Sequence, residues 1–168
     1  TFKDVADRYQ REALPLKAPR TRKDNISELA QLLRFFNDPP VVLDEIEAMH
    51  VRQYLDWRGK TAPVRANREK ALLSHIWNWA REKGITNLPN PCRGVKGFTE
   101  GGRDVYVSDD VYQAVYACAS GPLKDAMDLA YMTGQRPADV RKMSVTDVQG
   151  GLLAVHQGKT DARLRMRT

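Results

Sequence analysis

The side chains best suited to chemistry lie in two short motifs in the last quarter of the 168-residue sequence. The first is Thr-Gly-Gln-Arg-Pro-Ala-Asp at residues 133–139, and the second is Gln-Gly-Lys-Thr at residues 157–160. A glycine turn lets the backbone approach a ligand closely, and Pro137 suits the first turn of a helix. The sequence therefore predicts Arg136 beside the N-terminus of a helix, where anions bind readily.

Lys159 is predicted at the tip of a β-hairpin, because strand-like segments at 152–157 and 163–167 flank the turn at 158–162. Arginine presents a planar fork that matches two phosphate oxygens, whereas lysine is a point charge whose proton can be donated. Arg136 and Lys159 together have the chemistry of half a phosphoryl-transfer site. The plainer alternatives are a helix-end arginine that is solvated or paired with Asp139, and an ordinary turn lysine.

These two motifs, with Asp147 and a strand between them, resemble the first catalytic segments of tyrosine recombinases, in particular phage and prophage integrases. The resemblance implies that Arg136 holds the scissile DNA phosphate and that Lys159 is the general acid toward the departing 5′ oxygen. Asp139 stands where the family usually carries an acidic residue, more often Glu, that supports the arginine. The implied reaction is attack of a tyrosine hydroxyl on a phosphodiester to give a 3′-phosphotyrosyl bond, with no metal and no cofactor.

The remaining catalytic groups that the resemblance implies would follow the hairpin: a His-x-x-Arg segment, a further His or Trp, and the nucleophilic tyrosine. All six tyrosines of this sequence precede Lys159. Tyr112, Tyr116 and Tyr131 fall on the apolar stripes of predicted helices, which favours a role in the core. We therefore expect a DNA-binding part of a recombinase that is inactive by itself.

The formal charge of +6 is unevenly distributed along the chain. Residues 1–103 carry 19 Lys and Arg against 13 Asp and Glu, whereas residues 104–168 carry eight of each. This asymmetry favours a polyanionic partner for the first part. No apolar run approaches the roughly 18–20 residues of a membrane helix, and Cys92 and Cys118 lack metal-ligand spacing. We expect a cytoplasmic, nucleoid-associated protein of a bacterial host with free thiols.

Four helical patterns precede residue 85, and no strand-like alternation interrupts them. A capping box formed by Thr1 and Asp4 opens the first, and the others begin near Thr21, Glu47 and Pro63. The positions expected to face the core are Phe2, Val5, Ala6, Tyr9, Ile26, Leu29, Leu33, Phe36, Val51, Tyr54, Leu55, Leu72, Leu73, Ile76, Trp77 and Ala80.

Prolines and glycines at residues 86–105 predict a linker, which coincides with the change in charge. Two helices opened by Ser108 and Pro122 follow, with Val111, Val115 and Leu123 among their inward positions, and then come the short helix and the hairpin. The sequence therefore predicts a mainly α protein. The resemblance implies that its parts are a SAM-like helical core-binding bundle at 1–86, a linker at 87–105, and the start of an α-rich catalytic domain with a small antiparallel β-sheet at 106–168.

Basic residues cluster at the starts of the second and fourth predicted helices, where the resemblance implies that the bundle approaches duplex DNA. Arginine and lysine on phosphates would give salt-dependent affinity, and Asn67 or Arg65 could reach base edges. A solvated basic face is the plainer alternative. The expected DNA-binding residues are Arg20, Arg22, Lys60, Arg65, Asn67, Arg68 and Lys70.

The partner implied by the resemblance is double-stranded DNA at an attachment or recombination site, with self-association on the DNA into a tetramer and no membrane. Two alternatives stay open. One is a resolvase-like recombinase of the same family that acts on chromosomes or plasmids. The other is a non-catalytic DNA-binding regulator that keeps the fold, which a downstream His-x-x-Arg segment and tyrosine in the gene would exclude.

Overall fold

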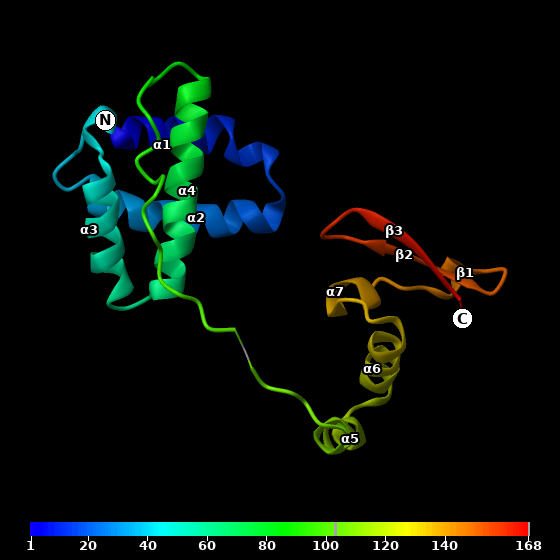
Figure 1. Cartoon of the computed structure of the whole chain (residues 1–168). Coiled ribbons are helices and arrows are strands. Elements are labelled where there is room, and N and C mark those ends of the chain that lie inside the picture. Colours follow the sequence, from blue (N-terminus) through cyan, green and yellow to red (C-terminus); the bar gives the residue numbers. More distant parts are fainter. Residues whose placement is uncertain (103, 168) are drawn as a thin grey trace. The chain divides into compact units, whose positions relative to one another are not determined.

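The computed structural model describes residues 1–102 and 104–167; Arg103, expected within the linker, and Thr168 lie outside them. The chain divides into two compact units, Thr1–Gly102 (unit 1) and Arg103–Thr168 (unit 2). The helices of unit 1 are α1 (Phe2–Glu12), α2 (Pro19–Phe36), α3 (Ala48–Gly59) and α4 (Pro63–Glu82) (Figure 1). Unit 2 contains α5 (Asp109–Cys118), α6 (Gly121–Thr133), α7 (Pro137–Val140), β1 (Val148–Gln149), β2 (Leu152–Gln157) and β3 (Ala162–Arg167). The prediction of a mainly α protein with a small antiparallel sheet is confirmed.

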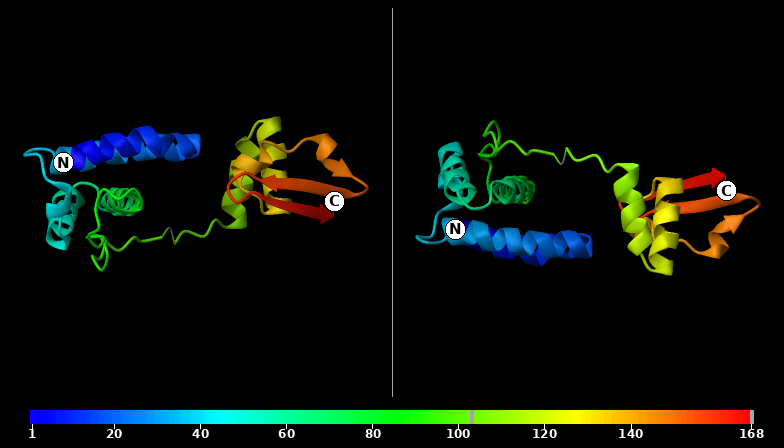
Figure 2. Two further views of the ribbon diagram at one scale, coloured as in Figure 1. Left: turned by 90° about the horizontal axis from the view of Figure 1, so that it is seen from above. Right: turned by 90° about the horizontal axis from the view of Figure 1, so that it is seen from below.

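In unit 1, α4 runs beside α3 and crosses α1 and α2 steeply (Figures 1 and 2). The predicted capping box opens α1: Asp4 Oδ2 accepts a hydrogen bond from the Thr1 backbone, and Thr1 Oγ1 accepts one from the Asp4 backbone at 3.4 Å. Aromatic rings join the helices, with Phe2 and Phe36 at 5.5 Å and Phe36 stacked on Tyr54 at 5.8 Å between ring centroids. The apolar periodicity of α1, α3 and α4 thus predicted their buried faces correctly.

The prediction for α2 is wrong in one position. Ile26 is 42% exposed, whereas Leu32, which was not expected inward, is fully buried with Leu29 and Phe36. The reason is that α2 packs through a different row of side chains. Positions 29, 32 and 36 lie on one face of a helix, and so do positions 26, 29 and 33. Periodicity alone could not choose between the two rows.

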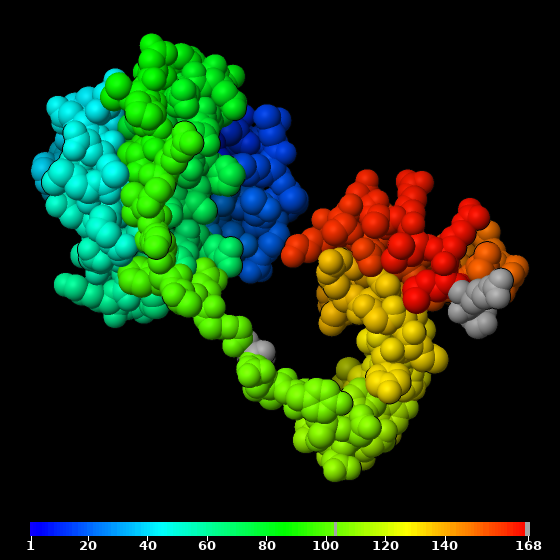
Figure 3. All heavy atoms as spheres, viewed as in Figure 1, coloured from blue at the N-terminus to red at the C-terminus, as the bar shows by residue number. Residues whose placement is uncertain are grey.

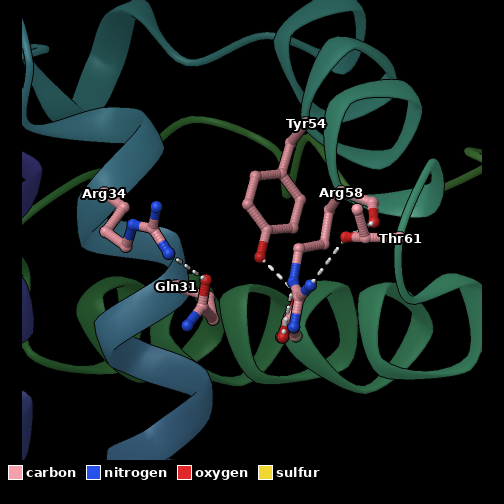
Figure 4. A network of polar contacts seen from close by, with 6 residues as sticks. Gln31, Arg34, Tyr54, Arg58 and Thr61 are labelled. Carbon is pink, nitrogen blue, oxygen red and sulfur yellow. Dashed lines mark hydrogen bonds and ion pairs between the residues drawn. The ribbon is translucent and has the colours of Figure 1, made fainter.

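A buried carboxylate that periodicity did not reveal lies inside unit 1. Glu69 on α4 is only 2% exposed, and its oxygens accept hydrogen bonds from Tyr54 Oη at 2.6 Å and Arg58 Nε at 3.0 Å. Arg58 also donates to Thr61 Oγ1 at 3.2 Å, so the network reaches the turn between α3 and α4 (Figure 4). Burial, together with the bond to Glu69, raises the pKa of Tyr54 well above its usual range.

Replacing Glu69 by alanine should lower the free energy of unfolding of unit 1 by roughly 3 kcal/mol, since it leaves Arg58 charged and largely buried without its partner. The three tryptophans, Trp57, Trp77 and Trp79, all lie in unit 1, so their fluorescence during denaturation of the whole chain reports this unit. Tyr54→Phe, which keeps the Arg58 contact, should cost less, about 1.5–3 kcal/mol. Equal stability of Glu69→Ala and the parent chain would contradict a structural role for the network.

Residues 88–100, which we call the strap, have no secondary structure of their own and lie along α4 (Figure 3). Trp77 Nε1 donates to the Leu88 carbonyl at 3.2 Å, Asn90 Nδ2 donates to Ser74 Oγ at 2.9 Å, and the Lys70 ammonium donates to the Val95 carbonyl. The division between the units accordingly falls after Gly102, and residues 87–102, expected as linker, belong to unit 1. Proline and glycine content predicted the irregular backbone but not these side-chain partners.

Two further features fix the strap. The Phe98 ring fills the space beside Gly59, where a Cβ atom would lie 2.2 Å from the ring. The Arg52 guanidinium lies 5.6 Å from the centre of that ring and donates to the Lys96 carbonyl at 3.0 Å. Cys92, within the strap, is 5% exposed, and burial raises the pKa of its thiol to about 12. Gly59 therefore ends α3 and also leaves the space that the Phe98 ring of the strap occupies.

The predicted burial of the α5 and α6 stripes is wrong. Neither helix has a buried residue among those described. Four of the side chains expected inward are half exposed or more, namely Val111 (53%), Val115 (54%), Leu123 (50%) and Tyr131 (76%), whereas Tyr116, Met127 and Ala130 are partly buried. Tyr112 of α5 joins the two stripes, since its ring lies 5.7 Å from that of Tyr131 on α6 and 6.1 Å from that of Tyr116 on its own helix. In the described residues, no helix is both long and apolar enough to cross a bilayer.

The sheet has the order β1-β2-β3 with antiparallel pairing throughout. The predicted hairpin is confirmed, and its register pairs Leu152 with Arg167 and Gln157 with Ala162. Alternation along β2 buries Leu153 and Val155 on one face, where the core of unit 2 also includes Val140 of α7. The hairpin is thereby packed against the helix that follows Arg136.

Candidate functional site

The turn that carries Arg136 is shaped by its neighbours. Gly134 has a φ of +61°, the left-handed conformation that ends α6 and that favours glycine. Arg136 then caps α7, which is only four residues long, and the Asp139 and Val140 backbone N–H groups both donate to the Arg136 carbonyl, at 2.8 and 3.0 Å. The expected contribution of a helix dipole is therefore small, and the guanidinium itself supplies the positive charge. Its side chain is 47% exposed.

Asp139 joins the two motifs. Its Oδ1 atom accepts a hydrogen bond from the Gly158 backbone at 2.9 Å, and its Oδ2 atom lies 3.9 Å from Arg136 Nη1. The carboxylate is 4% exposed, and Oδ2 has no hydrogen-bond partner in the described chain. Buried polar atoms almost always have a hydrogen-bond partner. Oδ2 can therefore accept a further hydrogen bond, and the nearest charged donor is Arg136.

A second link between the motifs comes from glutamines that the sequence did not single out. Gln157 Nε2 donates to Gln135 Oε1 at 2.7 Å, and Gln135 Nε2 donates to the Thr133 carbonyl at 3.1 Å. Two hydrogen bonds thus hold the hairpin to the segment around Arg136: the one from Gln157 to Gln135 and the one from the Gly158 amide to Asp139. These residues stand inside both motifs, and their spacing was the only signal that could have pointed to them.

Lys159 lies at the exposed tip of the hairpin, one residue beyond the Gly158 amide that binds Asp139. Its ammonium has no hydrogen bond or ion pair with any of the described residues. The turn is held by Thr160 Oγ1, which donates to Gln157 Oε1 at 2.9 Å, and by Asp161 at a φ of +55°. The structure therefore brings Arg136 and Asp139 into one group, and places Lys159 next to that group with a free side chain.

Lys142 is a nearby cation that the sequence analysis missed. A Cβ atom added to Gly158 would lie 2.8 Å from Lys142 Nζ, so the glycine allows this close approach. Lys142 lines a hollow of about 570 Å³ together with Asp139, Asp147, His156, Arg163 and Arg165. Arg163 and Arg165 stand opposite His156 and Ala154 on the exposed face of the hairpin, so the alternation of β3 could have revealed them.

The residues expected to bind DNA fall into two groups in unit 1. Arg22, Lys60 and Arg65 are exposed, and no side-chain partner is present for them in the described chain. Arg20 is exposed too, with an ion pair to Asp24 at 3.0 Å. The others contact the strap: Asn67 binds the Phe98 backbone, Arg68 pairs with Glu100, and Lys70 binds the Val95 carbonyl.

Comparison with known proteins supports the resemblance stated above, although no family model matches the chain. The integrase of Enterobacteria phage 434 is 31% identical over 149 residues, and that of Escherichia phage lambda is 31% identical over 150; each match covers 85% of this chain. Lambda integrase structures share the fold: a tetramer bound to a Holliday junction has a TM-score of 0.84 at 24% identity, covering all of this chain and 51% of that one. A dimer bound to a COC′ core site has a TM-score of 0.82 at 23% identity, covering 99% and 48%.

The chain spans about 40% of the length of the two curated relatives. The structural match to the DNA-bound lambda integrase tetramer covers the whole chain and therefore both motifs, which the structure joins through Asp139. These matches make the chain similar to a part of the phage integrases, which are tyrosine recombinases, and the chain shares the fold of lambda integrase.

Proposed function

We propose that this chain is the DNA-binding part of a site-specific recombinase, in which unit 1 holds duplex DNA and unit 2 carries the arginine and lysine of the phosphoryl-transfer site. The observation that carries the proposal is the Asp139 carboxylate, which binds the turn before Lys159 and faces the guanidinium of Arg136. One buried carboxylate thus links the two cationic motifs, because Asp139 of the first binds Gly158 of the second, nineteen residues further along the chain. Such fixed charge is what a phosphoryl-transfer site needs most.

In the proposed reaction, a tyrosine oxygen attacks the scissile phosphorus and the bond to the 5′ oxygen breaks. Arg136 donates two parallel hydrogen bonds to the non-bridging oxygens, and Lys159 gives its proton to the departing 5′ oxygen. The phosphotyrosyl bond conserves the energy of the phosphodiester, so a 5′ hydroxyl of another strand can reverse the step. Neither a metal nor a nucleotide is required in this scheme.

Two tyrosines of the chain are poorly suited to be the nucleophile. Tyr116 Oη donates to Asp128 Oδ2 at 2.8 Å, and this bond raises the pKa of Tyr116. Tyr54 is buried on Glu69, and its pKa is raised as well. A raised pKa disfavours the phenolate, which is the attacking form. We therefore assign attack to another tyrosine of the whole protein.

The proposed partners are duplex DNA and further copies of the protein, assembled as a tetramer on the DNA in the cytoplasm of a bacterial host. The related lambda integrase structures, a dimer on a core site and a tetramer on a Holliday junction, support this assembly. Arg20, Arg22, Lys60 and Arg65 are the proposed phosphate contacts of unit 1, because they are exposed on the basic part of the chain.

Binding of the whole chain to a labelled duplex should weaken steadily as salt rises. If about four to six phosphates are contacted, log affinity should fall against log salt with a slope of roughly −3.5 to −5.5. Arg65→Ala should weaken binding and reduce the magnitude of that slope by about one. Fluorescence anisotropy measures both quantities.

The matched control is Lys3→Ala. Lys3 is a cation of the same unit whose ammonium is already paired with Asp7 at 2.6 Å. It should change neither affinity nor slope appreciably. Equal effects of Arg65→Ala and Lys3→Ala would mean that charge attracts DNA without a defined face, and no binding at all would refute the proposed function of unit 1.

A further inference from the structure

The strap ends on an anion that sits among the expected DNA contacts. Glu100 Oε1 accepts a hydrogen bond from Asn67 Nδ2 at 2.8 Å, and Glu100 Oε2 accepts one from Arg68 Nη2 at 3.2 Å. Both donors lie on the second turn of α4, and Arg65, exposed, precedes Arg68 by three residues on the same side of the helix. A negatively charged group with two oxygen acceptors therefore occupies a basic helix surface.

Asn67 is held so that it presents a donor at this position. Its Oδ1 atom accepts from the Phe98 amide at 2.8 Å, and its Nδ2 atom donates to the Phe98 carbonyl at 2.8 Å. Gly97 allows this fit, since a Cβ atom there would lie 2.4 Å from Asn67 Oδ1. With the carboxamide fixed by the Phe98 backbone, its second N–H must point to whatever lies at the place of Glu100.

The Arg68–Glu100 pair itself is exposed, with 62% and 36% of the two side chains accessible. Exposed pairs of this kind shift an equilibrium by no more than about fivefold, so a competing anion can displace the carboxylate. A phosphate is well suited to do so, because the guanidinium fork and an amide N–H both match its oxygens. Gly101 and Gly102 follow Glu100 directly. Because glycine allows many backbone conformations, the chain can move Glu100 away from α4 at little cost.

We propose that Asn67 and Arg68 form a phosphate subsite for duplex DNA, which Glu100 occupies in the free protein and must vacate when DNA binds. The inference rests on the proposed DNA-binding function of unit 1 and adds a regulatory contact to it. Glu100 lowers the affinity of unit 1 for DNA, and DNA binding in turn frees the end of the strap.

The test is the affinity of the whole chain for a labelled duplex of random sequence, measured by anisotropy. Glu100→Gln should tighten binding by roughly threefold to tenfold, since it removes both the competing charge and its repulsion of the phosphates. Glu82→Gln is the matched control: Glu82 is exposed at the end of the same helix and has no ion pair in the described chain. It should tighten binding by less than about twofold, as expected for a distant charge in water.

A second pair of variants separates competition from general charge. In an Arg68→Ala background, Glu100→Gln should gain clearly less than it does in the parent chain, because the subsite has lost its cation and only the repulsion of the phosphates is left to remove. The inference is overturned if Glu100→Gln matches the control in the parent chain, or if its full gain persists without Arg68. Absence of DNA binding by the parent chain would instead refute the proposed function. Unchanged tryptophan fluorescence in each variant shows that unit 1 is intact.

Discussion

Under the proposed function, Arg136→Lys in the whole protein should slow DNA cleavage by about 10²–10³-fold, although the charge is kept. Lysine cannot make two parallel hydrogen bonds to the non-bridging oxygens, and its ammonium would not sit where the guanidinium does. The structure adds a second reason. Asp139 Oδ2, buried and without a hydrogen bond, lies 3.9 Å from Arg136 Nη1 and can orient a guanidinium that closes on a phosphate.

The rate of covalent protein–DNA adduct formation on a nicked suicide substrate, followed on denaturing gels, measures this effect. Arg141→Lys is the matched control, because Arg141 is an exposed arginine just beyond α7 with no side-chain partner in the described chain. It should cleave at nearly the parent rate. Cleavage by Arg136→Lys within tenfold of the parent rate would show that the guanidinium fork is not needed.

Lys159→Ala should lose about 10²–10⁴-fold in the same assay, the usual contribution of a general acid. The cause differs from that of Arg136, because the lost group is the proposed proton donor to the 5′ oxygen. The exposed, unpartnered ammonium at the hairpin tip is free to reach a leaving group. A substrate with sulfur at the 5′-bridging position departs without that proton, because a thiolate is a far weaker base than an alkoxide.

The sulfur substrate should therefore restore cleavage by Lys159→Ala but not by Arg136→Ala. Rescue of neither variant, or of both equally, would remove the general-acid assignment. If the parent protein itself makes no adduct on either substrate, the alternative of a non-catalytic DNA-binding regulator gains support.

Local sequence signals predicted the elements whose shape depends on adjacent residues. The capping box of Thr1 and Asp4, the glycine turn at Gly134, and the hairpin of β2 and β3 are all confirmed. Each follows from interactions within a few residues, or from strict alternation of apolar side chains, and needs no knowledge of the rest of the fold.

The features that were missed depend on partners distant in sequence. Glu69 looks like an ordinary helix-surface residue, and only Tyr54 and Arg58 on another helix make its burial favourable. Residues 87–100 have the composition of a linker, and their attachment relies on α4 side chains such as Asn67. The stripes of α5 and α6 are apolar by sequence, yet a stripe is buried only where another surface covers it.

The candidate site divides in the same way. The residue types and spacing indicated Arg136, Asp139 and Lys159, and the structure places the first two together and the third beside them. No pattern in the sequence indicated that Asp139 binds the Gly158 amide, nor that Gln135 and Gln157 are hydrogen-bonded to each other. Those contacts join the turn and helix around Arg136 to the hairpin, so only the fold could reveal them.

The buried thiol of Cys92 allows the opening of the strap to be measured by thiol labelling. Thiolates alone react with maleimides, so Cys92, buried and with a raised pKa, is labelled only in molecules whose strap has lifted from α4. Cys118, which is exposed, supplies an internal standard in the same molecule. The ratio of the two labelling rates is then an opening equilibrium constant for the strap, obtained from natural cysteines without any added probe.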